Sequence, residues 1–404
     1  MRTLFRAAAL ASLLTLSAPA LAQASPAGTT RDADALSKAR AIGNSARKVK
    51  KFYAPQFDLS GIEPYRPSRR FSGLVRQWGN NYIKDSGLVD VWEAEFRRYH
   101  PGVRFEDNLS SSSVAFPGLI AGVADLAPMG RQALWDELKG FEREGGAGGG
   151  EGGVSTVEAV EIVIATGSYD VRGWTYALGV LVHKDNLLAN LTMEQLDGVF
   201  GSRRDGGWDG LTWRTDWARG PEKNIRTWGQ LGLKGRWADK PIHLYGYNAK
   251  YHFQDEIDKK VLKGSSKWNE DLRAFSNLAG LKPDGSLTPG GELIADAVSK
   301  DPYGIGYTGI QFLTPQTKAL ALAPAGKPAV PLTLQTVHDR TYPLLRDVYY
   351  YLRKEKGKPI DPLQREFLRY ILSREGQSAI QADGKYLPLT PEMVREQLAK
   401  LDAQ

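Results

Sequence analysis

"LVRQWGNNYIKDSGLVDVWEAEFRRYHPGVRFEDNL", residues 74–109, predicts a strand, a helix and a second strand in direct succession. Pro101 and Gly102 end the expected helix. The apolar side chains that share one face of this helix are Leu88, Val89, Trp92, Phe96 and Tyr99. Short apolar strands alternating with amphipathic helices are typical of α/β layers with largely parallel sheets.

The same alternation continues along the chain. Further strands are expected at 157–165, 176–184 and 241–247. "TMEQLDGVF", residues 192–200, carries the capping-box pair Thr192 and Gln195, and "DPLQREFLRYILSREGQSAI", residues 361–380, predicts one long late helix. No repeat of fixed period interrupts this order, so the pattern favours layered α/β domains.

The N-terminus has the composition of a secretory signal peptide. Arg2 and Arg6 precede an apolar run and the small residues "ALAQA", which predicts a signal peptide over residues 1–22 with cleavage near Ala22 or Ala24. The sequence contains no cysteine, which excludes a lipoprotein anchor, disulfides and thiolate metal sites. We therefore expect an exported, soluble, periplasmic protein, and the export signal disfavours nucleic acid as a partner.

Roughly 380 residues remain after cleavage, more than one hydrophobic core usually holds, so two domains are expected. Residues 23–70 lack periodicity and predict a weakly structured extension. The five histidines have no metal-ligand spacing and no G-x-S-x-G elbow is present, so the sequence predicts neither a catalytic site nor a cofactor.

Four serines, Ser110 to Ser113, precede an apolar segment with helical spacing at Phe116, Leu119, Ile120 and Val123. Unpaired N–H groups and partial positive charge at a helix N-terminus attract anions, and several hydroxyls can line a small pocket there. The alternative is a helix cap followed by a solvated loop. Pro117 adds the expectation that the helix begins later than Ser113.

The segments "LVDVWEAEFRRYHPGVRFEDNLSSSSVAFPGLIAGVADLAPMGR", "YALGVLVHKDNLLANLTMEQLDGVFG", "DPYGIGYTGI" and "YPLLRDVYYYLRKEKGKPIDPLQREFLRYILSREGQSAIQADGKYLPL" together resemble the phosphate-binding proteins of bacterial ABC importers. The resemblance covers about Leu74 to Leu389. It implies an α/β, two-lobed periplasmic-binding-protein type II fold with two chain crossovers. Lobe 1 would hold residues 71–168 and 308–395 and lobe 2 residues 169–307, with crossovers near 165–179 and 303–309.

The resemblance also implies ligand-binding residues. It puts the family's ligand serine at Ser112, with Ser111 and Ser113 beside it, and Arg131 at a place where relatives often have arginine. A buried arginine binds an oxyanion in bidentate fashion, although a structural ion pair is an equal alternative for Arg131. The family's proton-accepting aspartate corresponds to Gly130.

Two parts of the family's site depart from its pattern. The first loop reads "NNYIKDSG", which puts Lys84 and Asp85 near the ligand; Asp85 would replace the missing proton acceptor or cap the next helix. The Arg-x-x-x-Ser-Gly-Thr segment corresponds to "YNAKYHF", with Tyr247 at the arginine and Tyr251 at the serine. These tyrosines would either bind ligand or pack at the cleft.

The sequence therefore predicts a nonenzymatic, monomeric receptor for inorganic phosphate or another small oxyanion, serving an ABC permease. The alternative is a non-transport protein of the same fold that recognises polysaccharide or a protein partner. It rests on the tryptophan-rich segment 208–237, because indole rings stack on sugar faces. Packing of these tryptophans inside the second lobe is the other reading.

Overall fold

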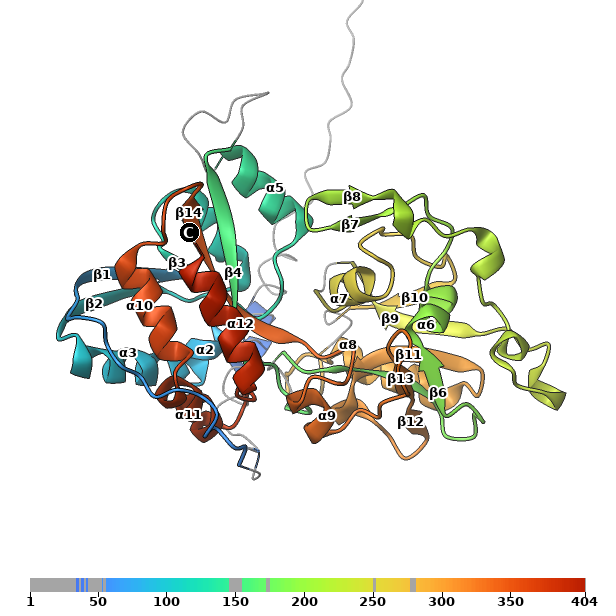
Figure 1. The fold of residues 1–404 in the computed structure, drawn as a ribbon. Coiled ribbons are helices and arrows are strands. Elements are labelled where there is room, and N and C mark those ends of the chain that lie inside the picture. Colours follow the sequence, from blue (N-terminus) through green and yellow to red (C-terminus); the bar gives the residue numbers. More distant parts are fainter. Residues whose placement is uncertain are drawn as a thin grey trace, which may run out of the picture.

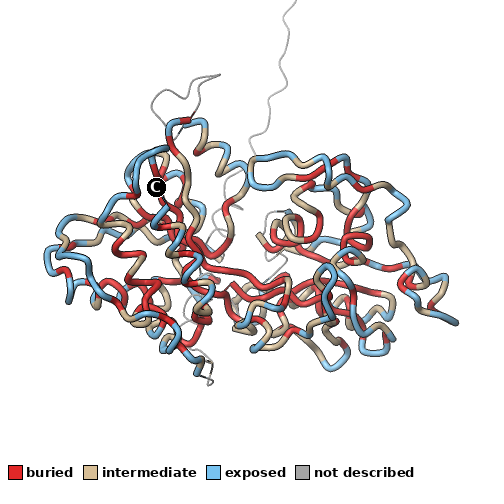
Figure 2. The backbone as a smooth tube through the Cα atoms, viewed as in Figure 1, coloured by how far each residue is buried: buried red, intermediate tan, exposed pale blue. Residues whose placement is uncertain are grey.

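The computed structural model describes residues 56–144, 155–171, 175–249, 252–276 and 281–403, together with Tyr53 and six positions between 34 and 42. The expected signal peptide, its cleavage near Ala22 or Ala24, and Tyr251 lie outside the described residues. The described chain forms two lobes side by side (Figure 1). Figure 2 shows buried backbone in the interior of each lobe and along the segments that join them.

Lobe 1 contains a five-stranded sheet in the order β2-β1-β3-β14-β4. The first three strands are parallel, and β14 pairs antiparallel with both β3 and β4. The strands are β1 (Ser72–Trp78), β2 (Gly102–Asn108), β3 (Leu126–Met129), β4 (Val157–Thr166) and β14 (Asp347–Glu355). The helices are α2 (Tyr82–Asp85), α3 (Leu88–Tyr99), α4 (Ala115–Ile120), α5 (Trp135–Glu144), α10 (Pro362–Ile371), α11 (Arg374–Asp383) and α12 (Pro391–Asp402).

Lobe 2 contains a second five-stranded sheet in the order β10-β9-β11-β5-β12. Here β11 is parallel to β9 and antiparallel to β5. The strands of the sheet are β5 (Leu178–His183), β9 (His243–Tyr247), β10 (Leu272–Phe275), β11 (Gly304–Gly309) and β12 (Thr317–Ala319). The other elements are β6 (Asn190–Thr192) with β13 (Ala321–Ala323), the hairpin β7 (Gly207–Asp209) and β8 (Thr212–Arg214), and the helices α6 (Met193–Phe200), α7 (His252–Lys260), α8 (Gly290–Lys300) and α9 (Leu334–His338).

The predicted face of α3 is buried, except at its C-terminal end. Leu88, Val89, Trp92 and Phe96 pack into the core of lobe 1, whereas Tyr99 is exposed. Gly87 precedes the helix at φ 83°, a left-handed conformation that glycine adopts without strain. The predicted strand–helix–strand unit is confirmed by the parallel pairing of β1 with β2.

The chain crosses between the lobes twice, as expected, but the second crossover differs from the predicted place. The first lies between β4 and β5. Residues 303–309, predicted as the second crossover, instead form β11 in the middle of the lobe 2 sheet, and all six residues of β11 are buried. Leu345 still packs in the lobe 2 core and Val348 in the lobe 1 core, so the return crossover is at Arg346. The predicted boundary at residue 308 is therefore wrong by about forty residues, because β11 to α9 complete lobe 2.

The predicted long late helix is two helices. α10 ends at Ile371, and α11 begins at Arg374. Ser373 caps α11 by accepting a hydrogen bond from the Gly376 N–H. A serine that caps a new helix offers the backbone an alternative to continuing the old one, which explains the break.

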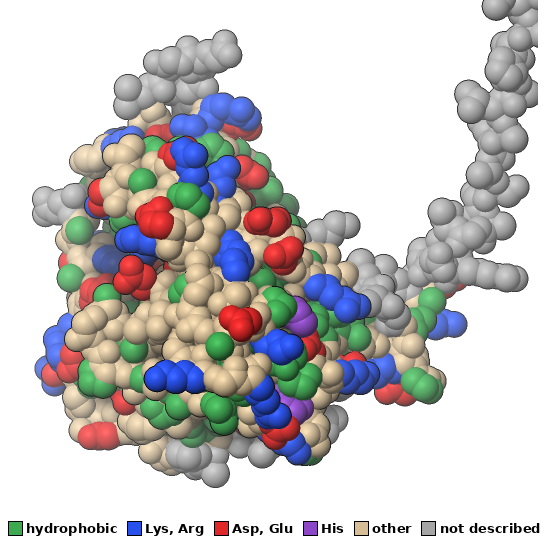
Figure 3. Space-filling view, turned by 90° about the vertical axis from the view of Figure 1, so that its right-hand side faces the viewer, with side chains coloured by type: hydrophobic (Ala, Val, Ile, Leu, Met, Phe, Trp, Pro, Cys, Tyr) green, Lys and Arg blue, Asp and Glu red, His purple; other side chains and the backbone are tan. Residues whose placement is uncertain are grey.

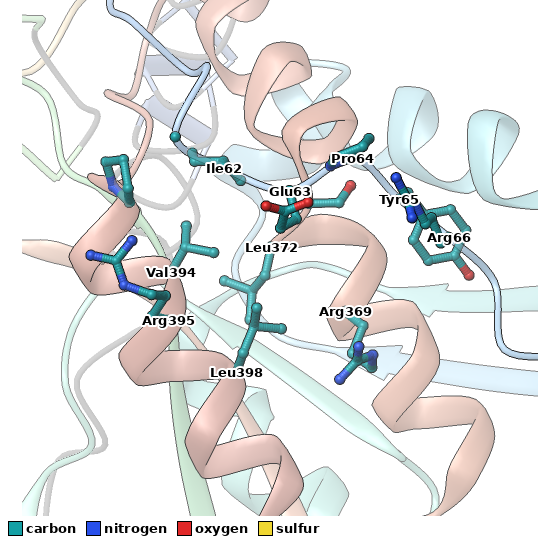
Figure 4. Close-up of a pocket in the computed structure, with 13 residues that line it drawn as sticks. Ile62, Glu63, Pro64, Tyr65, Arg66, Arg369, Leu372, Val394, Arg395 and Leu398 are labelled. Atoms are coloured by element: carbon teal, nitrogen blue, oxygen red, sulfur yellow. The ribbon is translucent and has the colours of Figure 1, made fainter.

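The described part of the N-terminal extension has no helix or strand between 56 and 70, yet it is firmly packed. Leu59, Ile62 and Tyr65 are buried in lobe 1, and the Tyr65 hydroxyl donates to Glu366 at 2.8 Å. This segment borders a cavity of about 320 Å³ against α10 and α12 (Figure 4). The expected weak structure is correct only for regular elements, because long-range contacts hold the segment.

Candidate functional site

Four separate segments of the chain meet around Gly130, directly after β3. The Gly130 N–H donates to Ser112 Oγ at 3.3 Å, and its carbonyl oxygen accepts from Thr175 Oγ1 at 3.0 Å and from Arg346 Nη2 at 3.4 Å. A Cβ atom at Gly130 would lie 2.7 Å from Asn80 Nδ2. The loops after β1, β2 and β3 therefore converge with both crossovers at one point.

Arg346 is a fully buried cation at this convergence. It has 1% of its surface exposed, and its guanidinium carbon lies 4.8 Å from the centre of the Phe253 ring. Its Nε is 3.6 Å from Glu256 Oε1, beyond hydrogen-bond distance. Within the described residues, Arg346 Nε and Nη1 have no hydrogen-bond partner. An arginine cannot lose its charge in a protein, so these buried N–H groups require an acceptor.

On the lobe 2 side, the first turn of α7, which begins at His252, borders the convergence around Gly130 and Arg346. Burial lowers the pKa of His252 well below its usual value, and the nearby cations Arg346 and Arg131 lower it further. The imidazole is therefore neutral near pH 7, with one donor and one acceptor nitrogen. Burial opposes the ionisation of Glu256, but Lys260 and Arg346 outweigh it and lower the pKa of this carboxyl.

The lobes also touch away from the crossovers. Lys259 Nζ of α7 donates to the carbonyl oxygen of Ala133 at 2.6 Å. The ring of Trp135 at the start of α5 lies 5.2 Å from that of Trp208 on β7, and Figure 1 shows α5 beside the β7–β8 hairpin. These contacts join lobe 1 to lobe 2 on the side of the molecule occupied by α5.

A groove of about 430 Å³ lies between the lobes and is bordered by residues of both. Arg340 and Asp347 on its wall form a bidentate ion pair at 2.7 and 2.9 Å. Lys260 Nζ donates to the Leu345 carbonyl, so the groove extends to the residue before Arg346. Arg340 is therefore neutralised at hydrogen-bond distance, whereas Glu256 Oε1 lies 3.6 Å from Arg346 Nε.

The serine run contributes one contact to the convergence. Ser112 Oγ accepts from the Gly130 N–H, whereas Ser111 accepts from the Ser113 N–H as a cap and Ser113 is exposed. The helix begins at Ala115, as Pro117 predicted, after a short 3-10 turn at Ser112–Val114. α4 ends at Ile120, so the expectation that Val123 faces inward is wrong, and Val123 is exposed.

Arg131 and Lys84 are both engaged in ion pairs. Arg131 donates from Nη1 and Nη2 to the two carboxylate oxygens of Glu137, each at 2.6 Å, which is the ion-pair alternative. Lys84 lies at the surface with Nζ 2.6 Å from Asp90 Oδ1 and 3.4 Å from Asp107 Oδ2. Their positive charges are therefore neutralised within lobe 1.

Asp85 and Tyr247 each form hydrogen bonds with neighbouring side chains of their own lobe. Asp85 ends α2 and accepts from Asn81 Nδ2 at 2.9 Å; it is not the N-cap of α3, which is Gly87. The Tyr247 hydroxyl is buried, 2.7 Å from Thr308 Oγ1 and 3.2 Å from the Tyr176 hydroxyl. Of the two alternatives for Tyr247, binding ligand or packing at the cleft, the structure shows a packed side chain.

Two of the tryptophans of the 208–237 segment pack inside lobe 2. Trp228 and Trp237 are buried with their rings at 6.0 Å and nearly perpendicular. Trp213 remains 42% exposed on β8. Trp228 and Trp237 therefore fit the packing interpretation, and the one exposed ring of the segment, Trp213, lies on the β7–β8 hairpin.

Arg346 is the functional candidate that the sequence reasoning missed. The available signal was the charged pair Arg346 and Asp347 inside an otherwise apolar and aromatic run, "PLLRDVYYYL". Burial of an arginine there demands a partner, but the partner's identity depends on contacts from distant segments.

The described residues contain no helix with the length and apolar character needed to span a membrane. In the same part of the chain, no three or more His, Asp or Glu side chains are grouped as metal ligands.

Comparison with known proteins places the chain in a family. Residues 84–375 match the model of the PBP superfamily domain. The phosphate-binding protein PstS of Pseudomonas aeruginosa is 30% identical over 352 residues, which cover 85% of this chain and 93% of that protein. Protein SphX of Synechococcus elongatus is 22% identical over 322 residues, covering 79% of each chain. The solved structure of PstS from Borrelia burgdorferi covers 79% of this chain and all of its own, with 17% identity and a TM-score of 0.47. The match to the superfamily model, together with the two sheets and the two crossovers of the structure, confirms the two-lobed α/β fold. The chain belongs to the PBP superfamily and is a relative of bacterial phosphate-binding proteins.

Proposed function

We propose that the protein is an exported, nonenzymatic solute receptor that captures phosphate or a related small oxyanion between its lobes and delivers it to an ABC permease. Membership of the PBP superfamily and the names of the relatives support the class of ligand. The observation that carries the proposal is the buried guanidinium of Arg346 where the lobes meet, because two of its N–H-bearing nitrogens have no acceptor among the residues that the structure describes.

The surroundings of Arg346 suit an anion. Glu256 is the nearest carboxylate to Arg346, and Lys260 also pairs with it at 3.5 Å, so one carboxylate faces two cations. Ser112 and His252 add a hydroxyl and a neutral imidazole, both able to donate to an oxyanion. The excess positive charge and the polar donors belong to both lobes, which would close around the ligand.

The expected affinity is moderate. One hydrogen bond to a charged group contributes about 1.5–3 kcal/mol, whereas micromolar binding corresponds to about 8 kcal/mol. Arg131 and Lys84 already have carboxylate partners, so Arg346 must supply the main charged contacts. We therefore expect phosphate to bind in the micromolar range or more weakly.

Calorimetry of the mature protein with phosphate and with sulfate tests the proposal. We expect saturable heat with phosphate and its loss in Arg346→Gln. Arg340→Gln is the matched control, because Arg340 lies on the same segment but is neutralised by Asp347. Binding that survives in a folded Arg346→Gln protein, or no heat with any oxyanion, would refute the proposed site.

A further inference from the structure

A second group of arginines lies inside lobe 2, beyond the C-terminal end of α6. Arg204 donates from Nη1 and Nη2 to Asp197 at 2.6 and 2.7 Å, and Arg219 Nε is 3.5 Å from the same carboxylate. Arg226 donates to the carbonyl oxygens of Gly198 and Gly201 at 2.9 and 3.0 Å. We call these three arginines and Asp197 the α6 arginine cluster.

The cluster has more positive than negative charge. Arg204 and Arg219 face the Asp197 carboxylate, and Arg226 lies close enough to Arg219 to repel it. The C-terminus of α6 adds about half a negative charge, so the three guanidinium groups and one carboxylate leave about 1.5 positive charges. Glu222, Glu270 and Asp271 act on the cluster from a distance, but all three are exposed and form no ion pair among the described residues. Burial, together with repulsion from Arg204 and Arg226, lowers the pKa of Arg219, in accord with this excess.

The excess positive charge of the α6 arginine cluster is buried inside lobe 2. On the end of the molecule formed by lobe 2, basic and acidic side chains are interspersed (Figure 3). Within the cluster, the side chains of Arg204 and Arg219 are only 5% and 4% exposed. Bulk water and surface counter-ions are therefore poorly placed to neutralise them.

Arg219 also has unused hydrogen-bonding groups. Its Nη2 donates to the Ser202 carbonyl at 2.8 Å, but Nε and Nη1 have no hydrogen-bond partner in the described chain. Arg204 differs, because its Nε reaches the Trp217 carbonyl at 2.9 Å and its other two nitrogens reach Asp197. A buried charged donor without an acceptor is costly, and such groups usually indicate a bound ion or water.

We propose that the α6 arginine cluster binds a small inorganic anion at Arg219 Nη1, chloride or an oxyanion, as a site separate from the interlobe site. The anion neutralises the excess charge and joins residues 202–226 to the end of α6. The proposal rests on contacts within lobe 2 alone and does not depend on the proposed receptor function.

Thermal unfolding in a chloride-free, phosphate-free buffer tests this site, with sodium chloride titrated at constant ionic strength against a bulky organic anion. We expect a saturable rise in Tm of about 3–6 °C. Arg219→Met should remove the rise, whereas Arg203→Met should keep it, because the Arg203 side chain is 70% exposed and, among the described residues, pairs with Asp205 alone.

The Arg346→Gln variant separates the two anion sites. It should lose interlobe phosphate binding and keep the chloride-dependent rise in Tm. A rise that disappears with Arg346→Gln, or that persists in Arg219→Met, would overturn the proposal. If Arg219→Met does not fold, a bromide-soaked crystal of the unaltered protein decides: an anomalous peak within hydrogen-bond distance of Arg219 Nη1 supports the site, and its absence refutes it.

Discussion

Arg131 and Arg346 both lie against Gly130, but only Arg131 has a carboxylate partner at hydrogen-bond distance among the described residues. Arg131 follows Gly130 directly and is held by both oxygens of Glu137. Arg346 comes from the crossover and contacts the Gly130 carbonyl, with no carboxylate in hydrogen-bond distance. The difference teaches that two arginines beside the same glycine can differ in how far their charges are neutralised. It is the reason for proposing Arg346, and not Arg131, as the ligand residue.

The largest expected effects are a loss of phosphate affinity on substitution of Arg346 and a loss of folding stability on substitution of Arg131. Arg346→Gln should lower phosphate affinity by about 100-fold, the loss of roughly 3 kcal/mol of charged hydrogen bonding. Arg131→Gln should instead lower the free energy of unfolding by about 3 kcal/mol, because Glu137 loses its partner in a largely buried pair. Calorimetry and chemical denaturation of both variants measure the two quantities.

The opposite result would contradict this comparison of Arg131 with Arg346. An Arg131→Gln protein that folds normally but no longer binds phosphate would make Arg131 the ligand residue and leave Arg346 a structural one.

A smaller effect is expected at the serines. Ser112→Ala should weaken phosphate binding by about tenfold, since a hydrogen bond contributes about 1–1.5 kcal/mol. Ser113→Ala is the matched control, because Ser113 is exposed and its side chain makes no contact with Gly130 among those described. Equal losses in both variants would mean that the whole serine loop, and not the Ser112 hydroxyl, matters.

The contact between Trp135 and Trp208 should affect affinity by about fivefold. An aromatic pair contributes about 0.5–1.5 kcal/mol beyond its buried area, and this pair exists only when the lobes are close. Trp208→Ala should therefore destabilise the arrangement in which the lobes are close together, and so weaken phosphate binding. Trp135→Ala should have the same effect, and the double variant should lose no more than either single one; additive losses would exclude a direct coupling.

No change in phosphate affinity is expected at Glu93, where a buried acid meets another acid. Burial and the neighbouring Asp107 raise the pKa of Glu93 to about 8. Because the folded state then holds this proton more tightly than the unfolded state, Glu93 favours folding fully below about pH 4.5, and this stability is lost as the pH rises to 8. Denaturation midpoints should fall across that range. Glu93→Gln should flatten the curve, and an unchanged slope would locate the titration elsewhere.

Glu93 extends the comparison of Arg131 with Arg346. At Glu93, burial and Asp107 outweigh the cation Arg97 at 3.6 Å, and the carboxyl group takes up a proton. An arginine cannot change its charge in this way and needs an anion. The same reasoning connects Arg346 with Arg219 of the α6 arginine cluster.

Much of the fold could be predicted from local pattern. The apolar face of α3 and the capping box of α6 depend on residues within one or two turns, and both are present. The break before Ser373 was missed, although a serine in a helical pattern is a known cap. The second crossover was missed because the strand character of residues 304–309 depends on pairing with β9 and β5, which are distant in sequence.

The candidate site was harder to predict, because neutralisation is a long-range property. The sequence gives no sign that Glu137 captures Arg131, or that Arg346 reaches Gly130 across 216 positions. The family resemblance predicts Ser112 as a ligand residue, and this stays a prediction. It did not reveal that Ser112 accepts from the Gly130 N–H, nor which charges surround that contact.

The tryptophan contact between α5 and the β7–β8 hairpin has a practical consequence. Since one indole belongs to each lobe, any hinge motion changes the environment of both chromophores at once. Because the chain has ten tryptophans, the part of any emission change that disappears in Trp135→Phe is the part that reports lobe separation in the unlabelled protein.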